Sequence, residues 1–450
     1  MDLISIFRGF VGVLLLIGIA FLFSNNKKKV NWRLVIIGLS LQFLIAILII
    51  KGEALGSFFA PLGWIKEGFK AVSGVFVLIL NFTSEGSTFI FGSLGISPGT
   101  DGSMGMFFAF QVLPVIIFFA SLMAVLYHLG IMQKIVQGMG WIMYKTMGTS
   151  GAESLSVSAN IFVGQTEAPL MVKPFLKGLT KSELLTIMTG GMATIAGSVM
   201  AAYIQMLGYS FAQSMGVTLE EGQLLFATHL LGASVMAAPA ALIISKIIFP
   251  ETEEPETKGT VKIEVEKTAS NPIEAAAIGA SDGVQLALNV GGMLIAFIAL
   301  IALVNYLLQG FGDLVDINSL LIAEYGQPLN LQFILGFILQ FLAVAIGVPW
   351  ESALEFGSLI GTKVILNEFV AYSDLSNLIS MGEMVNDKAI LMATYALCGF
   401  ANFSSIAIQI GGISPIAPNQ RKNLAELGLK AVLGGTLATL MTATLAGILF

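Results

Sequence analysis

Residues 159–175 read ANIFVGQTEAPLMVKPF, and this stretch decides how the rest of the chain is interpreted. It places Gln165, Thr166 and Glu167 between two apolar pieces, each of which is too short to cross a bilayer. Glycine and proline residues interrupt both pieces, so a continuous helix is not expected to run through them. In a membrane-bound chain, the stretch therefore predicts the tip of a broken helix rather than its middle.

The composition shows that the chain is an integral membrane protein. Hydrophobic residues make up 56% and charged residues 11% of the 450 residues, and the mean hydropathy is +0.87. That is too little polar surface for a water-soluble globule of this size. Long apolar stretches interrupted by glycine favour helices over a barrel. A single cysteine, Cys398, excludes an internal disulfide, and a formal charge of -6 argues against a nucleic-acid partner.

The positions of lysine and arginine orient the predicted spans. The apolar segments 3–24 and 33–50 flank NNKKKVNWR, a basic cluster that we place on the cytoplasmic side, with the amino terminus outside. The first segment has no small-residue cleavage site, so we interpret it as a retained span. Segment 62–92 is amphipathic and is expected to lie along the membrane interface. Further spans are predicted at 104–127, 183–206, 222–249, 273–309 and 388–412. A last span follows the turn PNQRKN (418–423) and ends at Phe450.

Two segments are predicted to enter the membrane and return on the same side. The first, 151–177, has lysines at its flanks that place both of its ends in the cytoplasm. The second, PWESALEFGSLIGTKVILNEFVAYSDL (349–375), carries its own polar tip and by the count of spans dips from the outside. Each is followed by a span interrupted by small and polar residues, at GGMATIAGS (190–198) and GFANFSS (399–405). Opposed, discontinuous helix pairs are typical of the binding site of a secondary transporter.

This repeat organises the whole chain. We divide it into a peripheral pair of spans (1–60), an interfacial helix with a scaffold span and an amphipathic connector (61–150), the first repeat (151–249), a cytoplasmic loop (250–271), a second scaffold span (272–327) and the second repeat (328–450). The two repeats together would form the transport domain.

Glu167 and Glu368, at the two hairpin tips, are the first candidates for function. A carboxylate near the bilayer centre costs roughly 2.5–3.5 kcal/mol on insertion scales, so it is a functional candidate by default. The alternative is that each carboxylate only caps or pairs within its own tip.

Neighbouring polar residues favour the functional interpretation. Gln165 and Thr166 lie beside the first tip, and Asn402, Ser404 and Ser405 lie in the broken span after the second. This set has many acceptors and few fixed positive charges, so it suits a neutral solute that bears hydroxyl or amide groups.

Two long motifs resemble those of a known family. GQTEAPL (164–170) and GTKVILNEFVAY (361–372) are similar to the signature motifs of the concentrative nucleoside transporters, and the second fits their G-x-K-x-x-x-N-E-F-V-A-Y pattern at every fixed position. EGSTFIFG (85–92) and CGFANFSSIAIQIGG (398–412) are also similar, so the resemblance covers nearly the whole chain. It implies an all-α membrane protein with eight transmembrane helices, two opposed re-entrant hairpins, an inverted repeat and an interfacial helix. It also implies a homotrimer in which each protomer has its own substrate path.

The resemblance also implies roles for individual residues. The substrate-binding residues would be Gln165, Thr166 and Glu167 on the nucleobase side, Glu368, Asn402 and Ser405 at the ribose hydroxyls, and Val199 and Phe400 as apolar neighbours. Sodium would be held by the side chains of Asn160 and Thr194 and by backbone carbonyls at Asn160, Val163 and Ile195. Neutral oxygens suit a hard monovalent cation. Thr194 stands where the family is expected to have serine, whereas the intact GQTE tip favours sodium over protons.

The sequence therefore predicts a sodium-coupled nucleoside importer of a bacterial inner membrane that works by alternating access, with sodium as coupling ion and no other cofactor. Proton coupling is the nearer alternative, and a membrane enzyme or channel is the more distant one. No nucleophile–base pair or metal-ligand spacing indicates an enzyme. The choice between purines and pyrimidines, the ion-to-substrate ratio and the role of Lys363 are left open at this point.

Overall fold

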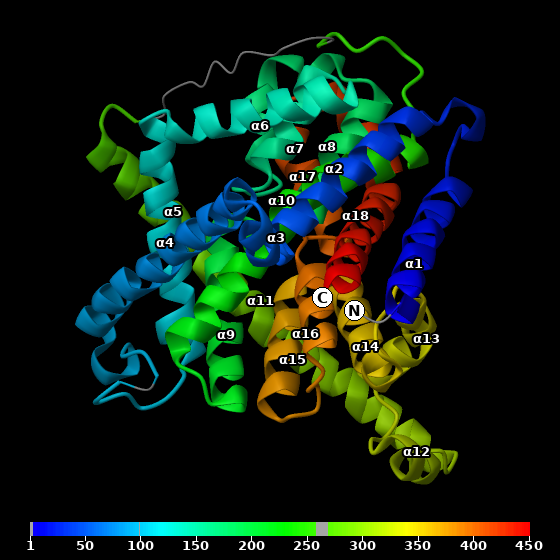
Figure 1. Ribbon diagram of the computed structural model, residues 1–450. Helices are drawn as coiled ribbons and strands as arrows, with labels where there is room; N and C mark the ends of the chain where they lie inside the picture. Colours follow the sequence, from blue (N-terminus) through cyan, green and yellow to red (C-terminus); the bar gives the residue numbers. More distant parts are fainter. Residues whose placement is uncertain (1–2, 99, 258–268) are drawn as a thin grey trace.

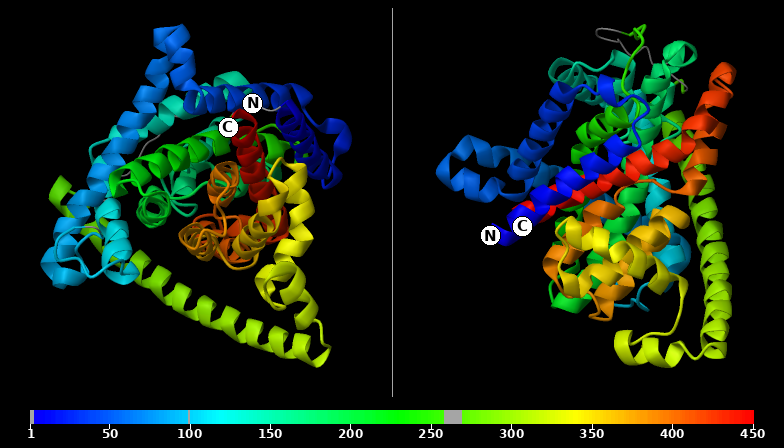
Figure 2. Two further views of the ribbon diagram at one scale, coloured as in Figure 1. Left: turned by 60° about the horizontal axis from the view of Figure 1, so that its bottom comes forward. Right: turned by 90° about the vertical axis from the view of Figure 1, so that its right-hand side faces the viewer.

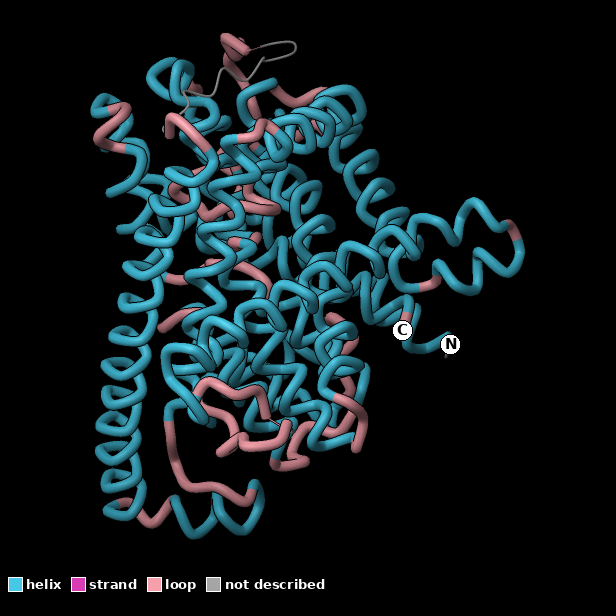
Figure 3. Tube along the Cα trace, turned by 90° about the vertical axis from the view of Figure 1, so that its left-hand side faces the viewer, coloured by secondary structure: helices cyan, strands magenta, loops and turns pink. Residues whose placement is uncertain are grey.

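The computed structural model describes residues 3–98, 100–257 and 269–450, and every regular element in these ranges is a helix (Figure 3). The α-helices are α1 (Leu3–Leu22), α2 (Trp32–Ile50), α3 (Gly52–Phe58), α4 (Ala60–Phe91), α5 (Leu113–His128), α6 (Ile131–Met147), α7 (Gly151–Ala159), α8 (Lys181–Ala193), α9 (Gly197–Met215), α10 (Leu219–Ile248), α11 (Pro272–Leu314), α12 (Asn318–Tyr325), α13 (Leu331–Ala345), α14 (Ala353–Ile365), α15 (Glu368–Ser380), α16 (Asp387–Leu397), α17 (Phe403–Ile413) and α18 (Arg421–Leu449). The predicted all-α class is confirmed. Residues 258–268 of the predicted loop 250–271 lie outside the described residues.

Seven helical segments in the described ranges are long and apolar enough to cross a membrane, judged by length and composition. They are Trp32–Ile50, Gly63–Leu94, Phe108–His128, Lys181–Met215, Leu219–Ile248, Pro272–Leu314 and Pro418–Leu449. The predicted span 3–24 has a shorter apolar stretch, Ile6–Leu22, and the predicted span 388–412 is divided into α16 and α17. Segment 62–92, which we expect at the interface, forms α4, which crosses α5 obliquely (Figure 1). Its depth in a bilayer stays a prediction.

The longest helix, α11, runs along one edge of the molecule, and α5 packs against it (Figure 2). Glycines allow this close approach, because a Cβ at Gly283 would come within 2.7 Å of Ile117 Cα, and one at Gly279 within 2.7 Å of Ala120 O. In contrast, α10 and α18 lie in the interior, with 94% and 89% of their apolar windows buried. Because α1 packs beside α18, the two chain termini lie close together (Figure 2).

The two halves of the chain repeat the same order of elements. In the first half, α6 packs on α7, the first arm of a hairpin, and α8 and α9 are separated by a break at residues 194–196. In the second half, α13 packs on α14, the hairpin continues into α15, and α16 and α17 are separated by a break at 398–402. The predicted repeat thus has a structural counterpart in each half.

The hairpins differ in their second arms. In the first hairpin this arm is a 3₁₀ helix, Ala168–Gly178, with a non-helical residue at Val172. Pro174 removes a backbone donor and disfavours a helical conformation at the preceding residue, which explains the irregular arm. In the second hairpin the corresponding arm is the regular helix α15, whose amino-terminal cap is the side chain of Asn367.

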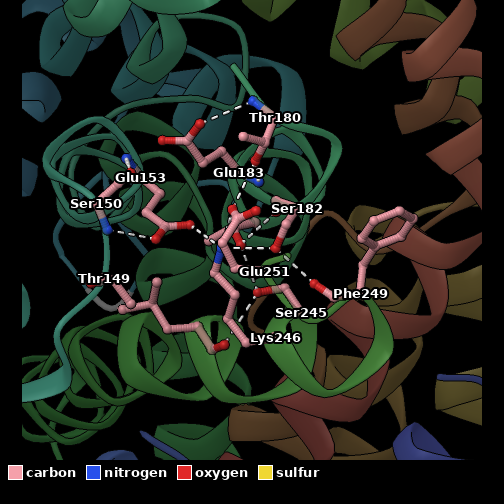
Figure 4. Close-up of polar contacts among 12 residues, drawn as sticks. Thr149, Ser150, Glu153, Thr180, Ser182, Glu183, Ser245, Lys246, Phe249 and Glu251 are labelled. Carbon is pink, nitrogen blue, oxygen red and sulfur yellow. Dashed lines mark hydrogen bonds and ion pairs between the residues drawn. The ribbon is translucent and has the colours of Figure 1, made fainter. Parts of the chain in front are cut away.

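The two arms of the first hairpin are anchored by matching helix caps. Ser150 N donates to Glu153 Oε1 (2.7 Å) at the start of α7, and Thr180 N donates to Glu183 Oε2 (3.0 Å) at the start of α8 (Figure 4). In both caps the serine or threonine side chain accepts from the glutamate backbone N–H in return. These reciprocal bonds fix where the hairpin begins and where the chain leaves it.

A buried lysine joins the two caps. Lys246, near the end of α10, forms an ion pair with Glu153 (2.7 Å) and donates to Ser182 Oγ (2.9 Å), so it connects α7 with α8 (Figure 4). Glu251 lies 3.6 Å from the same ammonium group. Thr257 accepts from the backbone N–H of Ala152 through its hydroxyl (3.1 Å). Both ends of the hairpin are therefore held at one place, as the predicted re-entrant path requires.

Candidate functional site

Glu368, the first residue of α15, has a buried carboxylate with two neutral donors. Oε1 accepts from the hydroxyl of Tyr203 in α9 (3.2 Å), and Oε2 accepts from Nδ2 of Asn402 in the second break (3.0 Å). The Tyr203 ring is held between the rings of Phe369 and Tyr372, with centroids 4.9 and 4.2 Å away. No carboxylate–cation pair involving Glu368 is found in the described part of the chain. The carboxylate is thus available to accept hydrogen bonds from hydroxyl groups.

From Asn402 a chain of polar contacts leads to the first hairpin. Asn402 Oδ1 accepts from the backbone N–H of Ser405 (2.9 Å), which caps α17. Gln165 Nε2 donates to Ser405 Oγ (3.0 Å), and Gln409 Nε2 donates both to Gln165 Oε1 (3.0 Å) and to Met188 O (3.0 Å). The tips of the two hairpins are therefore linked through α17.

Small residues let these segments approach. A Cβ at Gly191 of α8 would lie 2.8 Å from Gln165 Cβ and 3.0 Å from Gln409 Nε2. Likewise, a Cβ at Gly412 of α17 would lie 3.0 Å from Thr166 Cγ2. The glycines at 191 and 412 are thus explained by the packing of the first hairpin tip against these two helices.

Other predicted substrate residues lie nearby but outside this chain of bonds. Thr166 is half-buried, and the exposed side chain of Glu167 accepts, among the described residues, only from Gly164 N of its own tip (3.2 Å). Val199 is buried in the first turn of α9, and the Phe400 ring is half-buried in the second break. Side-chain hydrogen bonds therefore join Glu368, Asn402, Ser405 and Gln165. In the described ranges no side-chain hydrogen bond links the other four residues to this chain, although the Phe400 carbonyl accepts from Asn402 N (2.9 Å).

The predicted sodium side chains occupy the ends of two helices. Asn160 caps the carboxyl end of α7, is 1% exposed, and donates from Nδ2 to Ser156 O (3.1 Å). Its Oδ1 is buried and has no hydrogen-bond partner among the described residues. Thr194 caps α8 and is also 1% exposed; its hydroxyl donates to Gly190 O (2.9 Å), which leaves its oxygen lone pairs available. An unpartnered buried acceptor and a hydroxyl oxygen fit a cation that prefers neutral oxygen ligands.

The predicted backbone ligands lie in the turns that follow these two helices. Val163 belongs to the turn after α7, and Ile195 belongs to the break after α8. The turns are joined where Gly197 N donates to Phe162 O (3.0 Å). The carbonyl ends of two helices therefore face the same region, and helix carboxyl ends favour positive charge.

The two helix breaks cross each other. A Cβ at Gly399 would lie 2.6 Å from Met192 O and 2.9 Å from Ala193 C, so the second break passes directly over the end of α8. Phe400 N donates to Thr194 O (3.3 Å) at the same crossing. This contact places the predicted sodium region of the first repeat beside the Asn402 region of the second.

Sequence reasoning missed two residues of this arrangement, Tyr203 and Gln409. Gln409 is the single amide of α17 and lies between isoleucines, and such a residue is a functional candidate on insertion cost alone. The partnership of Tyr203 with Glu368 had no comparable signal, because a tyrosine inside a span is usually a packing residue.

Comparison with known proteins agrees with this geometry. The chain matches the families described as Na+ dependent nucleoside transporter N-terminus over residues 11–94, Nucleoside recognition over 109–210 and Na+ dependent nucleoside transporter C-terminus over 229–447. An uncharacterized transporter of Bacillus subtilis, YutK, is 44% identical over 98% of this chain and 99% of its own length. Sodium/nucleoside cotransporter 1 of Homo sapiens is 39% identical over 98% of this chain, which spans 63% of that relative.

Solved structures of a similar protein, CNTnw, have the same fold. Its inward-facing, substrate-bound structure matches with a TM-score of 0.83 and 40% identity over 98% of both chains. An outward-facing structure matches with a TM-score of 0.85 and 38% identity over 100% of this chain and 98% of that one. The sequence matches and the shared fold together show that the chain belongs to the family of sodium-dependent, concentrative nucleoside transporters.

Proposed function

We propose that this protein imports nucleosides across the inner membrane of a bacterium by sodium symport and moves its substrate without chemical change. Family membership supplies the class of transport. The hydrogen-bonded chain from Glu368 through Asn402 and Ser405 to Gln165 is the observation that supports the proposed substrate site. In this proposal the ribose hydroxyls bind Glu368, Asn402 and Ser405, because a carboxylate accepts from two hydroxyls and the amide and the serine hydroxyl both donate and accept.

The nucleobase would bind at the first hairpin tip. Gln165 offers both a donor and an acceptor to a base edge, with Thr166 and Glu167 beside it and Val199 and Phe400 as apolar neighbours. Two buried atoms support a bound ligand, since Gln409 Oε1 on the side of Gln165 and Asn367 Nδ2 next to Glu368 have no hydrogen-bond partner among the described residues. Unpartnered polar atoms are costly in the interior, and a bound polar solute would relieve that cost. This assignment leaves the choice between purines and pyrimidines to the shape of the pocket around Gln165.

Sodium is proposed to bind at Asn160, Val163, Thr194 and Ile195. The unpartnered Oδ1 of Asn160 is the observation that supports this site. Because the Thr194 carbonyl accepts from Phe400 N, an ion that orders the first break would also order the second. Sodium binding would then raise nucleoside affinity without touching the substrate.

Replacing sodium with choline should lower uptake of radiolabelled uridine into proteoliposomes by at least about tenfold, within the range usual for coupled binding. Asn160→Ala should show a similarly low uptake in sodium, because it removes the unpartnered oxygen. Sodium should also raise the thermal stability of the wild-type protein, by about 2.7 kcal/mol at a concentration of 100 times its Kd. It should not stabilise the Asn160→Ala variant.

Asn377→Ala is the matched control, because Asn377 is exposed on α15. It should keep wild-type uptake and wild-type stabilisation by sodium. Undiminished uptake in choline at fixed pH would reject the sodium site in favour of proton coupling. A lack of uptake of any nucleoside under all conditions would reject the proposed function itself.

The two repeats are proposed to move together past a scaffold. Segments 151–249 and 328–450 share the crossed breaks and the polar chain, so they are expected to behave as one transport domain. The scaffold would include α5 and α11, which pack on each other at the edge of the molecule (Figure 2). CNTnw has been solved in inward-facing, intermediate and outward-facing states, which supports alternating access in this family.

A homotrimer is proposed as the working assembly. Only 22% of the apolar window of α11 is buried within one chain, and side chains such as Ile295 (75% exposed) and Leu303 (55%) project from it. This face would pack against other protomers and lipid. Light scattering on the detergent-solubilised protein should give the mass of three chains, and a monomer would contradict the assembly.

A further inference from the structure

Each repeat brings two helix carboxyl ends together. In the first repeat these are the ends of α7 and α8, where Asn160 and Thr194 lie. In the second repeat they belong to α14, which ends at Ile365, and to α16, which ends at Leu397. The last carbonyls of a helix have no partner within it and carry partial negative charge. Both repeats therefore create a region that favours a cation.

The second region is already filled by a side chain. Lys363 lies in the last turn of α14 and is completely buried. Its Nζ donates to the carbonyl of Ala396, in the last turn of α16 (2.8 Å), and to the hydroxyl of Thr439 in α18 (3.0 Å). These ligands are of the same kind as those proposed for sodium, namely a helix-end carbonyl and a threonine hydroxyl.

The partners of Lys363 distinguish it from the buried lysine of the first hairpin. Lys246 pairs with a carboxylate, whereas no carboxylate pairs with Lys363 in the described ranges. A buried charge held only by neutral oxygens is expensive, so a lysine kept for packing alone would be a poor choice at this position. A sodium ion in the proposed site would likewise be a buried positive charge held by neutral oxygens.

We propose that the ammonium group of Lys363 is a built-in cation that occupies, in the second repeat, the place that sodium takes in the first. This inference rests on the proposed sodium site for its comparison, although its test does not. By binding Ala396 O, Lys363 fixes the end of α16 and hence the path of the break that leads to Asn402. Lys363 is thus a positioning residue: it acts through the break on the proposed ribose contacts.

Thr439 links this group to the crossing of the breaks. Its Cγ2 would lie 2.9 Å from a Cβ placed on Gly399, the residue that crosses the end of α8. The ammonium group therefore lies close to the crossing, to which the backbone of the proposed sodium ligand Thr194 also belongs. One site takes a removable ion and the other a tethered one, so in this proposal only the first can respond to a sodium gradient.

The test is chemical rescue in the full-length protein. Lys363→Ala removes the side chain beyond Cβ and leaves space for n-propylammonium, which has the size and charge of the missing part. Uridine uptake into proteoliposomes should fall at least about 100-fold, the loss typical of a displaced positioning element. Millimolar n-propylammonium should raise uptake by this variant at least about tenfold. In contrast, 1-propanol, which is neutral and of similar size, should leave its uptake unchanged.

A second readout does not depend on transport. n-Propylammonium should raise the melting temperature of Lys363→Ala by several degrees and leave that of the wild-type protein unchanged. This shift separates failure of the present inference from failure of the proposed function, since it requires no nucleoside. Equal rescue by 1-propanol, or no rescue and no thermal shift with the cation, would overturn the proposal.

Three further variants keep the proposal testable where Lys363→Ala does not fold. Thr439→Val removes one oxygen ligand at nearly constant volume and should lower uptake at least about tenfold, as expected for one hydrogen bond to a charged group. Thr439→Ser keeps the hydroxyl and should stay within about twofold of wild type. Equal activity of the valine and serine variants would contradict a ligand role for Thr439. Lys363→Met, which is apolar and of similar length, should be inactive, and wild-type uptake by it would overturn the charge requirement.

Discussion

Glu368→Gln is expected to abolish uridine uptake into proteoliposomes under an inward sodium gradient while leaving the protein folded. The carboxylate accepts from the Tyr203 hydroxyl and from Asn402 Nδ2, and in our proposal it accepts from the ribose hydroxyls when substrate is bound. An amide has only one acceptor oxygen, so its NH₂ group would face donors. Two lost hydrogen bonds to a charged group, at about 1.5–3 kcal/mol each, correspond to at least about a 100-fold loss of affinity.

Size-exclusion profile and melting temperature show whether the Glu368→Gln protein is intact. Glu220→Gln serves as the matched control, because Glu220 is an exposed residue in the first turn of α10. It should transport at the wild-type rate. Normal uptake by Glu368→Gln would refute the assignment of the ribose hydroxyls to this carboxylate.

Gly399→Ala is expected to disrupt both transport and stability, because the new methyl group would collide with backbone atoms. The Cβ would lie 2.6 Å from Met192 O and 2.9 Å from Ala193 C, and rotating a side chain cannot relieve a backbone contact. Overpacking of this kind costs about 1–3 kcal/mol or more. Displacement of the break would also misplace the region of Asn402 and the proposed sodium ligands, so uptake should fall at least about 100-fold.

Gly411→Ala provides the comparison for this prediction. Gly411 lies in the helix that follows the same break, and a Cβ there meets nothing within 4 Å. Its alanine variant should keep wild-type uptake and should melt at or slightly above the wild-type temperature, since alanine is the better helix former. Equal uptake and melting temperature for the two variants would show that the crossing of the breaks tolerates displacement.

The polar chain suggests why substrate and ion binding are coupled in one structure. Gln165 of the first hairpin binds Ser405 of the second repeat, and the Thr194 carbonyl of the first repeat binds Phe400 N of the second. A nucleoside placed between Gln165 and Ser405 would exchange a direct contact for two contacts through the substrate. In our proposal, sodium stabilises the same crossing from the opposite side, so each ligand favours the arrangement that binds the other.

The sequence by itself determined the helical membrane class, the two hairpins and the breaks. Gly164 and the prolines after it interrupt the helix at the first hairpin. Asn402 caps the helix that begins after the second break, three residues before Ser405 in the same motif. These are local signals: backbone restriction, capping and hydropathy act between residues that are neighbours in the chain. The sequence therefore predicted these elements and the polarity of their tips.

Only the tertiary structure decided which of these residues meet. Gln165 and Ser405 are 240 positions apart, Tyr203 and Glu368 are 165 apart, and Lys363 and Thr439 are 76 apart. Glu167 resembles Glu368 in the sequence, yet within the described part of the chain its side chain bonds only inside its own tip. Such partnerships follow from the packing of helices, often at glycine contacts, between segments that are far apart in the sequence, and hydropathy or local propensity carries no information about them.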